Sequence, residues 1–165
     1  MENEFNAGKI LSELNHINIT GPKPNVFMAV PTIYVKLIEE IKNHNIECDF
    51  SHIRLIVSGS AAMPRPISDE WESLTGCQLL ERYGMTEIGM GLSQSLNPAD
   101  RVDGSVGSPM LGVEARIRRE DGRLTYFEAN IDCQGELEIR TPGIFKEYWK
   151  LPEKTKDEFT GIFTV

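Results

Sequence analysis

The stretch VFMAVPTIYVKLIEEIKNHN, residues 26–45, predicts the first strand and the main helix of an α/β fold. Its opening run, residues 26–30, is short and continuously apolar, which is typical of a strand buried on both faces. Pro31 suits the first position of a helix. The apolar residues that follow recur at helical spacing: Ile33, Leu37, Ile38 and Ile41. We therefore expect a strand that leads into a helix ending near residues 44–45.

The neighbouring segments repeat this order. Residues 53–57 predict a second buried strand, which the small residues SGSAA at 58–62 follow, and residues 78–82 predict a third strand. Between them, helical spacing and a glycine cap predict another helix: Ile67, Trp71, Leu74 and Gly76. An amphipathic segment at residues 5–15 predicts a short helix before the first strand. The alternation of strands and helices predicts a partial parallel sheet with flanking helices.

The pattern changes after Gly104. Apolar and charged residues alternate along residues 113–118 and 136–140, which is typical of antiparallel strands. Asp121-Gly122 is a hairpin turn signal, residues 120–134 predict a loop, and a final short helix is expected over residues 152–159. The fold class is therefore α/β, with an α/β sheet portion at residues 1–103. The start of a small antiparallel β subdomain is expected at residues 104–165.

Composition excludes several classes of function. The net charge of −8 disfavours a nucleic-acid backbone as partner. The longest apolar runs fall far short of the roughly 20 residues of a membrane span. The N-terminal residues MENEFNAGK include acids and no arginine, which argues against a targeting peptide. The cysteines are far apart and lack the spacing of a zinc site or a disulfide framework.

Residues 80–90, LERYGMTEIGM, carry the clearest chemical signal. The ring of Tyr83 can stack on a base, and Gly84 lets the backbone turn sharply. The hydroxyl of Thr86 can donate to a phosphate oxygen. The carboxylate of Glu87 would repel phosphate unless a hard cation such as Mg²⁺ bridges the two groups. The segment therefore indicates a nucleotide and metal site, and the alternative is a strand that ends in an ordinary turn with Glu87 solvated.

Both residues 58–62 and residues 83–87 directly follow predicted strands. Ligands of α/β sheets bind beyond the carboxyl ends of the strands, so we expect both segments to face one crevice. Small residues at 59–61 would let an adenine plane lie against the backbone. The alternative for SGSAA is a tight turn between strand and helix that needs only small side chains.

The segment ERYGMTE resembles the signature of the adenylate-forming superfamily, which includes acyl-CoA synthetases, luciferases and peptide-synthetase adenylation domains. Other segments resemble this family in order and rough spacing: VFMAVP (26–31), VSGSAAMP (57–64), GSVGSP (104–109) and GELEIRTPGIFKEYW (135–149). The resemblance covers residues 25–163 and implies a fragment of the family's large N-terminal domain. Within the family, the chain is most similar to malonyl-CoA synthetases, through ERYGMTEIGM, NPADRVDGSVGSP and PEKTKDEF.

The resemblance implies specific roles for residues. ATP or AMP would contact Gly59, Ser60, Ala61, Glu81, Arg82, Tyr83, Gly84, Met85 and Thr86. Gly59, Ser60 and Ala61 would line the adenine pocket, and Tyr83 would stack on the base. Thr86 would contact the α-phosphate and Glu87 would bind Mg²⁺, so these two residues are the catalytic candidates.

The family reaction has two steps, in which a carboxylate attacks the α-phosphate of ATP and coenzyme A then takes the acyl group. The family carries a Ser/Thr/Gly-rich phosphate loop that ends in Lys upstream of such a segment, and the sequence contains no such loop. It also contains neither a GxxxxGK[ST] nor a GxGxxG pattern. The chain also reads GIFTV at 161–165, where the family continues toward its ribose-binding Asp and catalytic Lys. We therefore expect an acid–CoA ligase fragment that is inactive alone. The alternative is a non-catalytic nucleotide-binding or interaction product.

The substrate implied by the resemblance is malonate, which carries a second carboxylate. Burying that carboxylate without a cation would be costly, and an arginine offers a two-pronged partner. Arg101, in the loop most similar to the malonyl enzymes, is the candidate, and Met85 would narrow the acyl pocket. The alternatives are that Arg101 is a solvated residue paired with Asp100 or Asp103, that Met85 fills the core, and that the acid is a medium- or long-chain fatty acid. The resemblance implies a mitochondrial location, and the absence of a targeting signal leaves the cytoplasm as the alternative.

Overall fold

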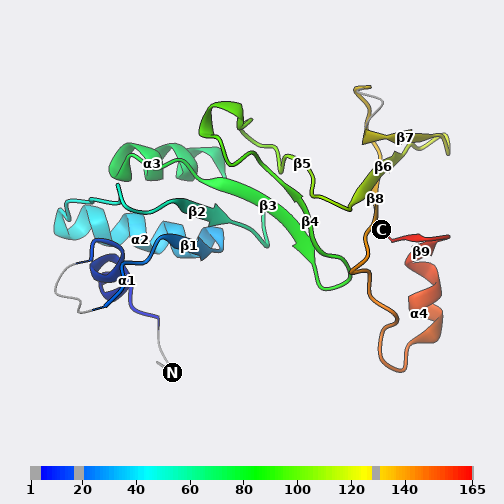
Figure 1. Cartoon of the computed structure of the whole chain (residues 1–165), viewed down its shortest axis with the longest axis horizontal. Helices are drawn as coiled ribbons and strands as arrows, with labels where there is room; N and C mark the ends of the chain where they lie inside the picture. Colours follow the sequence, from blue (N-terminus) through cyan, green and yellow to red (C-terminus); the bar gives the residue numbers. More distant parts are fainter. Residues whose placement is uncertain (1–4, 17–20, 128–130, 165) are drawn as a thin grey trace. The chain divides into compact units, whose positions relative to one another are not determined.

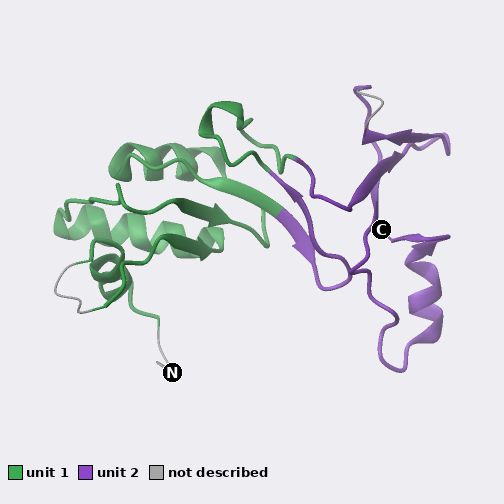
Figure 2. Ribbon diagram, viewed as in Figure 1, with its two compact units in different colours: residues 1–82, 94–107 green, residues 83–93, 108–165 purple. Residues whose placement is uncertain are grey.

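The computed structural model describes residues 5–16, 21–127 and 131–164. The chain divides into two compact units (Figure 2). Unit 1 consists of residues 1–82 and 94–107, and unit 2 of residues 83–93 and 108–165. Residues 83–93 thus group with the C-terminal part of the chain, and the expected division at residues 103 and 104 stays a prediction.

Unit 1 is built on parallel strands connected by helices (Figure 1). Its elements are α1 (Ala7–Leu14), β1 (Val26–Ala29), α2 (Pro31–His44), β2 (Leu55–Ser58), α3 (Arg65–Thr75), the start of β3 (Leu80–Met85) and the short 3₁₀ helix η1 (Pro98–Asp100). In the β1–β2 pair Val26 lies opposite Leu55, and in the β2–β3 pair Val57 lies opposite Leu80. The strand–helix–strand–helix–strand order expected from the sequence is confirmed.

Local signals end the helices where the sequence indicates. Asn45 follows α2 in the left-handed conformation, with a φ of 49°. Gly76 follows α3 with a φ of 70°, and its amide donates to the Glu72 carbonyl at 2.8 Å. At the start of α1, the Asn6 side chain accepts a hydrogen bond from the Lys9 amide, which satisfies one of the free donors of a helix N-terminus. No helix in the described ranges is both long and apolar enough to cross a membrane.

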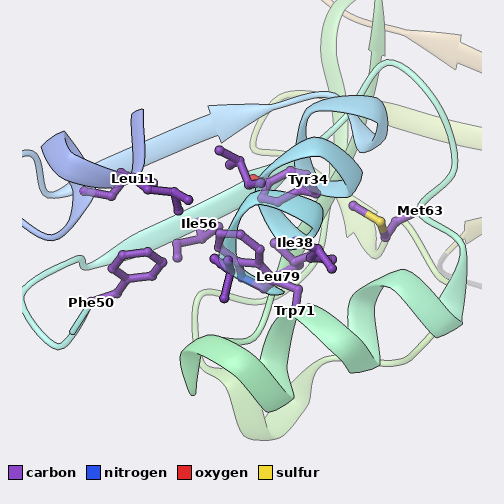
Figure 3. Close-up of a cluster of buried hydrophobic side chains, with 11 residues drawn as sticks. Leu11, Tyr34, Ile38, Phe50, Ile56, Met63, Trp71 and Leu79 are labelled. Atoms are coloured by element: carbon purple, nitrogen blue, oxygen red, sulfur yellow. The ribbon is translucent and has the colours of Figure 1, made fainter. Parts of the chain in front are cut away.

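An aromatic cluster forms the centre of the unit 1 core (Figure 3). Tyr34 from α2 and Trp71 from α3 are both 0% exposed, and their ring centroids lie 5.0 Å apart in an edge-to-face arrangement. Phe50 stacks on Trp71, with ring centroids 5.9 Å apart. The Tyr34 hydroxyl donates to the Val57 carbonyl at 2.6 Å. A buried hydroxyl needs a hydrogen-bond partner, and this bond connects α2 to β2 at Val57, one residue before the strand ends.

The expectation that the first strand is buried on both faces is wrong for β1. Met28 in the middle of β1 is 61% exposed. The strand pairs with β2 on one side, and within the described ranges it is the end strand of its sheet. The Sδ atom of Met28 accepts a hydrogen bond from Arg82 Nη2 at 2.9 Å. The apolar run therefore reflects a half-buried edge strand.

Unit 2 is mainly antiparallel. Its elements are the end of β3, β4 (Gly89–Ser93), β5 (Ser108–Pro109), β6 (Glu114–Arg118), β7 (Leu124–Tyr126), β8 (Glu136–Arg140), α4 (Pro152–Asp157), β9 (Phe159–Thr160) and β10 (Phe163–Thr164). One sheet has the order β7-β6-β8-β10-β9, so the expected antiparallel strands are confirmed. Two details are wrong. The predicted loop at 120–134 contains β7, and the last helix ends at Asp157, before Phe159 enters β9; residues 128–130 of that loop lie outside the described ranges.

The charged face of the β6–β8 pair has a buried centre. Glu138 is 0% exposed and accepts hydrogen bonds from Arg116 Nε and Arg118 Nε, both at 2.5 Å. The guanidinium of Arg116 lies 3.7 Å from the centroid of the Phe163 ring. In the strand register Arg116 faces Glu138, and Glu114 faces Arg140. Alternation along these strands therefore separates an apolar face from an ionic face, of which Arg116 and Glu138 are the buried centre.

Replacing Glu138 with glutamine is expected to destabilise the chain in a pH-dependent way. Burial alone would raise the pKa of Glu138, but hydrogen bonds from Arg116 and Arg118 outweigh burial and hold the pKa below its usual value. Such a carboxylate stabilises the fold above its unfolded-state pKa, about 4.3, and the stabilisation is lost as the pH falls through the folded-state pKa. Urea unfolding should therefore show a difference between wild type and variant that shrinks below about pH 4. A difference that does not change with pH would contradict this.

Candidate nucleotide and metal site

The predicted adenine loop follows β2 in unit 1. Ser60 and Ala61 are exposed, and Ser60 has a φ of 68°, in the left-handed region that few side chains adopt. A Cβ added to Gly59 would lie 3.4 Å from the Arg82 carbonyl oxygen. The loop backbone therefore runs close to β3 and presents small side chains to the outside. An exposed backbone edge of this kind is able to accommodate a flat ring.

The next predicted contacts, Glu81 and Arg82, engage residues of unit 1. Glu81 Oε2 accepts a hydrogen bond from the Met63 amide at 3.2 Å, which connects β3 to the end of the adenine loop. The Glu81 amide donates to Gln94 Oε1 at 3.0 Å. Arg82 donates to the Met28 sulfur. Glu81 and Arg82 thus support the loop and the neighbouring strand, and direct contact with a nucleotide stays a prediction for both.

Gln94 is a residue that the sequence does not single out. Its Nε2 atom donates to the carbonyls of Val102 at 2.7 Å and Ser105 at 2.8 Å. Because Gln94 Oε1 also accepts a hydrogen bond from the Glu81 amide, this one side chain joins β3 to the loop that follows β4. No sequence pattern marks such a residue, since its partners are identified only by the fold.

The predicted phosphate and metal residues form the turn after β3 in unit 2. Thr86 is exposed and Glu87 is half-buried, while Ile88 is buried and its amide donates to the Met85 carbonyl at 3.2 Å. A Cβ on Gly84 would overlap the Gly89 carbonyl, so the return strand β4 passes too close for any other residue. The buried Ile88 and the glycine thus fix a tight turn that leaves Thr86 exposed.

Glu87 is held by a segment far along the chain. The Tyr148 hydroxyl donates to Glu87 Oε1 at 2.6 Å, and the Phe145 amide donates to the Glu87 carbonyl at 2.7 Å. The hydrogen bond from Tyr148, with smaller contributions that include nearby Lys154, lowers the pKa of Glu87 below its usual value. The same bond raises the pKa of Tyr148 to about 12. At neutral pH Glu87 is therefore a carboxylate and Tyr148 a neutral donor.

The donor set of this turn fits a cation that is shared with a nucleotide. Among the described residues, no group of three or more His, Cys, Asp or Glu side chains is placed to hold a metal ion. Mg²⁺ at nucleotide sites needs no such cage, since it is bound by one or two carboxylates, by phosphate oxygens and by water. The ionised Glu87 beside the Thr86 hydroxyl suits that kind of site.

Tyr83 and Met85 lie two residues apart on β3. Both are half-buried, and the Tyr83 hydroxyl is 4.0 Å from the Met85 sulfur in a weak hydrogen bond. The two side chains therefore contact each other on one face of the strand. Stacking of Tyr83 on a base and narrowing of an acyl pocket by Met85 stay predictions.

Arg101 lies in unit 1 and holds its loop together through hydrogen bonds to backbone carbonyls. Its Nε, Nη1 and Nη2 atoms donate to the carbonyls of Ser95, Gln78 and Leu96, at 3.0, 3.0 and 3.1 Å. The expected alternative of pairing with Asp100 or Asp103 is wrong: Asp103 pairs with Arg65, and Asp100 accepts from the Asn97 side chain. Contact between Arg101 and a substrate carboxylate stays a prediction.

The structure thus brings the predicted residues together in two groups. Residues 59–61 lie against the start of β3 in unit 1, and residues 83–87 form one continuous strand end and turn in unit 2. The expected crevice shared by the two groups stays a prediction. Tyr148 is the main functional candidate that the sequence reading missed, although it lies in the segment GELEIRTPGIFKEYW that carries part of the resemblance.

Comparison with known proteins identifies the family. A family model described as AMP-binding enzyme matches residues 12–149. The chain is 44% identical to the Homo sapiens protein named malonate–CoA ligase ACSF3, mitochondrial, over 84% of this chain and 28% of that protein. The chain therefore spans less than a third of the length of that relative.

Solved structures agree. ATP-bound MatB from Rhodopseudomonas palustris is 36% identical, with a TM-score of 0.80 over 100% of this chain and 30% of that one. A malonyl-CoA ligase complex with methylmalonyl-CoA and AMP is 30% identical, with a TM-score of 0.78 over 97% of this chain and 32% of that one. Since the family model matches most of the chain, the protein belongs to the AMP-binding enzymes, the adenylate-forming family.

Proposed function

We propose that this chain is the nucleotide-binding middle part of an ATP-dependent, AMP-forming acid–CoA ligase that uses malonate. The observation that carries the proposal is the turn after β3, where the exposed Thr86 stands beside the Glu87 carboxylate, which accepts a hydrogen bond from Tyr148. The names of the relatives, malonate–CoA ligase among them, support the reaction and the acid.

The proposed chemistry needs charge neutralisation and positioning more than a covalent catalyst. The acid's carboxylate attacks the α-phosphorus of ATP and pyrophosphate leaves, which gives an acyl-adenylate. The thiol of coenzyme A then attacks the acyl carbon and AMP leaves. Thr86 would donate to an α-phosphate oxygen, Tyr83 would stack on the base, and residues 59–61 would contact the adenine. Bound through Glu87, Mg²⁺ would offset the negative charge of the phosphates.

The test is formation of malonyl-CoA from malonate, ATP and coenzyme A. We expect no product from the 165-residue chain alone, because it carries no phosphate-loop pattern to share the charge of the leaving pyrophosphate. We expect product from a complete ligase polypeptide that contains this chain. Steady turnover by the chain alone would contradict the first expectation. Nucleotide binding without product by the complete polypeptide would favour a non-catalytic binding protein instead.

Malonate as the acid is tested through Arg101. Replacing Arg101 with alanine in the complete ligase should lower kcat/KM for malonate about 100-fold, the scale of a lost charge-assisted contact to a buried carboxylate. A monocarboxylate of similar length, such as butyrate, should be affected much less, because it has no second carboxylate. An equal loss of kcat/KM for both acids, together with a lower free energy of unfolding, would mean that Arg101 only stabilises its loop. That result would favour a fatty acid as substrate.

We also propose that the ligase works in mitochondria. The support is the word mitochondrial in the name of the human relative. Microscopy of the tagged complete polypeptide tests this, and a diffuse cytoplasmic signal would count against it.

A further inference from the structure

Glu87 is connected twice to one distant segment of unit 2. Tyr148 donates from its hydroxyl to Glu87 Oε1 at 2.6 Å, and Phe145 donates from its amide to the Glu87 carbonyl at 2.7 Å. Both partners come from residues 145–148, about sixty positions along the chain. The backbone bond fixes where the residue lies, and the side-chain bond fixes one of the two carboxylate oxygens.

Tyr148 is itself held by contacts that do not involve Glu87. Its ring centroid lies 4.8 Å from that of Phe145, and Lys154 Nζ lies 4.7 Å from the Tyr148 centroid. The Tyr148 amide donates to Thr155 Oγ1 at 2.9 Å. Phe145 in turn stacks on Phe159, with centroids 5.1 Å apart. The phenol is therefore fixed by its surroundings before any ligand arrives.

We infer that Tyr148 is a positioning residue that orients the Glu87 carboxylate toward the Mg²⁺ that accompanies the nucleotide. The inference rests on the proposed function, because it takes Glu87 as the metal ligand. A phenol has a single proton to donate, so it engages one carboxylate oxygen and the second can bind a cation. A glutamate without this partner would have to lose rotamer freedom when the metal binds, which weakens binding. In many metal sites, residues that hydrogen-bond to the metal ligands fix the orientation of those ligands.

The test compares matched hydroxyl deletions in the complete ligase that contains this chain. Tyr148→Phe removes the donor but keeps the ring that packs on Phe145. Tyr126→Phe is the control, since its hydroxyl lies in the same unit but contacts Arg116, at 3.2 Å. Glu87→Gln and the double variant with Tyr148→Phe complete the set. The direct measurement is Mn²⁺ affinity in the presence of a non-hydrolysable ATP analogue, followed by electron paramagnetic resonance.

The expected result is about a 10-fold loss of Mn²⁺ affinity in Tyr148→Phe and no loss in Tyr126→Phe. Added to Glu87→Gln, the Tyr148 change should have no further effect, because the carboxylate it orients is gone. Turnover by Tyr148→Phe should need more Mg²⁺, and saturating Mg²⁺ should restore most of kcat. A variant that is merely less stable would keep the wild-type Mn²⁺ affinity in its folded fraction.

Four outcomes would overturn the inference. Unchanged Mn²⁺ affinity in Tyr148→Phe would remove the positioning role, and tighter binding would mean that the phenol competes with the metal. An equal loss in the Glu87→Gln background would mean that Tyr148 acts through another group. If Glu87→Gln itself left Mn²⁺ affinity unchanged, the metal assignment of the proposed function would be wrong and the inference would end with it.

Discussion

Replacing Glu87 with glutamine in the complete ligase is expected to lower the rate of acyl-adenylate formation about 100-fold, the effect of losing one preorganised electrostatic contact. Glutamine has the same shape, but its neutral amide is a much poorer ligand for a hard cation. It can still accept the hydrogen bond that Tyr148 donates to Glu87 Oε1, so the turn should keep its structure. Malonate-dependent exchange of pyrophosphate into ATP measures this step without coenzyme A.

A surface carboxylate in the same unit provides the control. Glu120 is exposed in the turn after β6. Glu120→Gln removes the same charge at a position that is far from the Glu87 turn in the sequence. The exchange rate of this variant should equal that of wild type. The proposed role of Glu87 would be wrong if Glu87→Gln exchanged pyrophosphate at the wild-type rate under limiting Mg²⁺.

Replacing Trp71 with alanine is expected to lower the free energy of unfolding by about 4 kcal/mol. The indole is 0% exposed and contacts the rings of both Tyr34 and Phe50. Alanine would leave a large cavity at the centre of the unit 1 core, and the surrounding helices can collapse into it only in part. Urea unfolding, followed by circular dichroism, measures the loss.

The chain contains its own control for this change. Trp149 is the same residue type but is 79% exposed, so Trp149→Ala should change the free energy of unfolding by about 0.5 kcal/mol or less. Trp71→Phe should cost much less than Trp71→Ala, because phenylalanine refills most of the volume and removes a buried indole N–H that has no partner among the described residues. Equal effects of the two alanine variants would contradict the described core.

The sequence predicts the elements that local chemistry specifies. Helix α2 begins at Pro31, because the proline ring holds φ near its helical value. Asn45 follows α2 and Gly76 follows α3, because the left-handed conformation after a helix favours these residue types. The alternation in β6 and β8 likewise reports strand geometry directly. Strand β7 was missed because Leu124–Tyr126 is too short for alternation to stand out from a loop.

The contacts that organise the candidate site are mostly not local. Tyr148 meets Glu87 across about sixty residues, so no spacing rule connects the two. Arg101 looks from its sequence like a free surface cation beside acids, yet its donors are taken by three carbonyls that only the folded loop brings near. The motif at residues 83–87 was recognisable because its members are neighbours in the chain. Their supporting residues were not.

The ionic face of the β6–β8 pair also restricts how these two strands can align. A slip of one residue would turn the apolar side chains toward the ionic face. A slip of two residues would keep the faces, but it would place Arg116 opposite Arg140 or Glu114 opposite Glu138. Each slipped register would then hold one like-charged and one oppositely charged pair, where the native register holds three oppositely charged pairs. Misaligned pairings are thus penalised in both directions. The order of charges works as an alignment code, and a charge reversal in one strand would call for a matching reversal in the other.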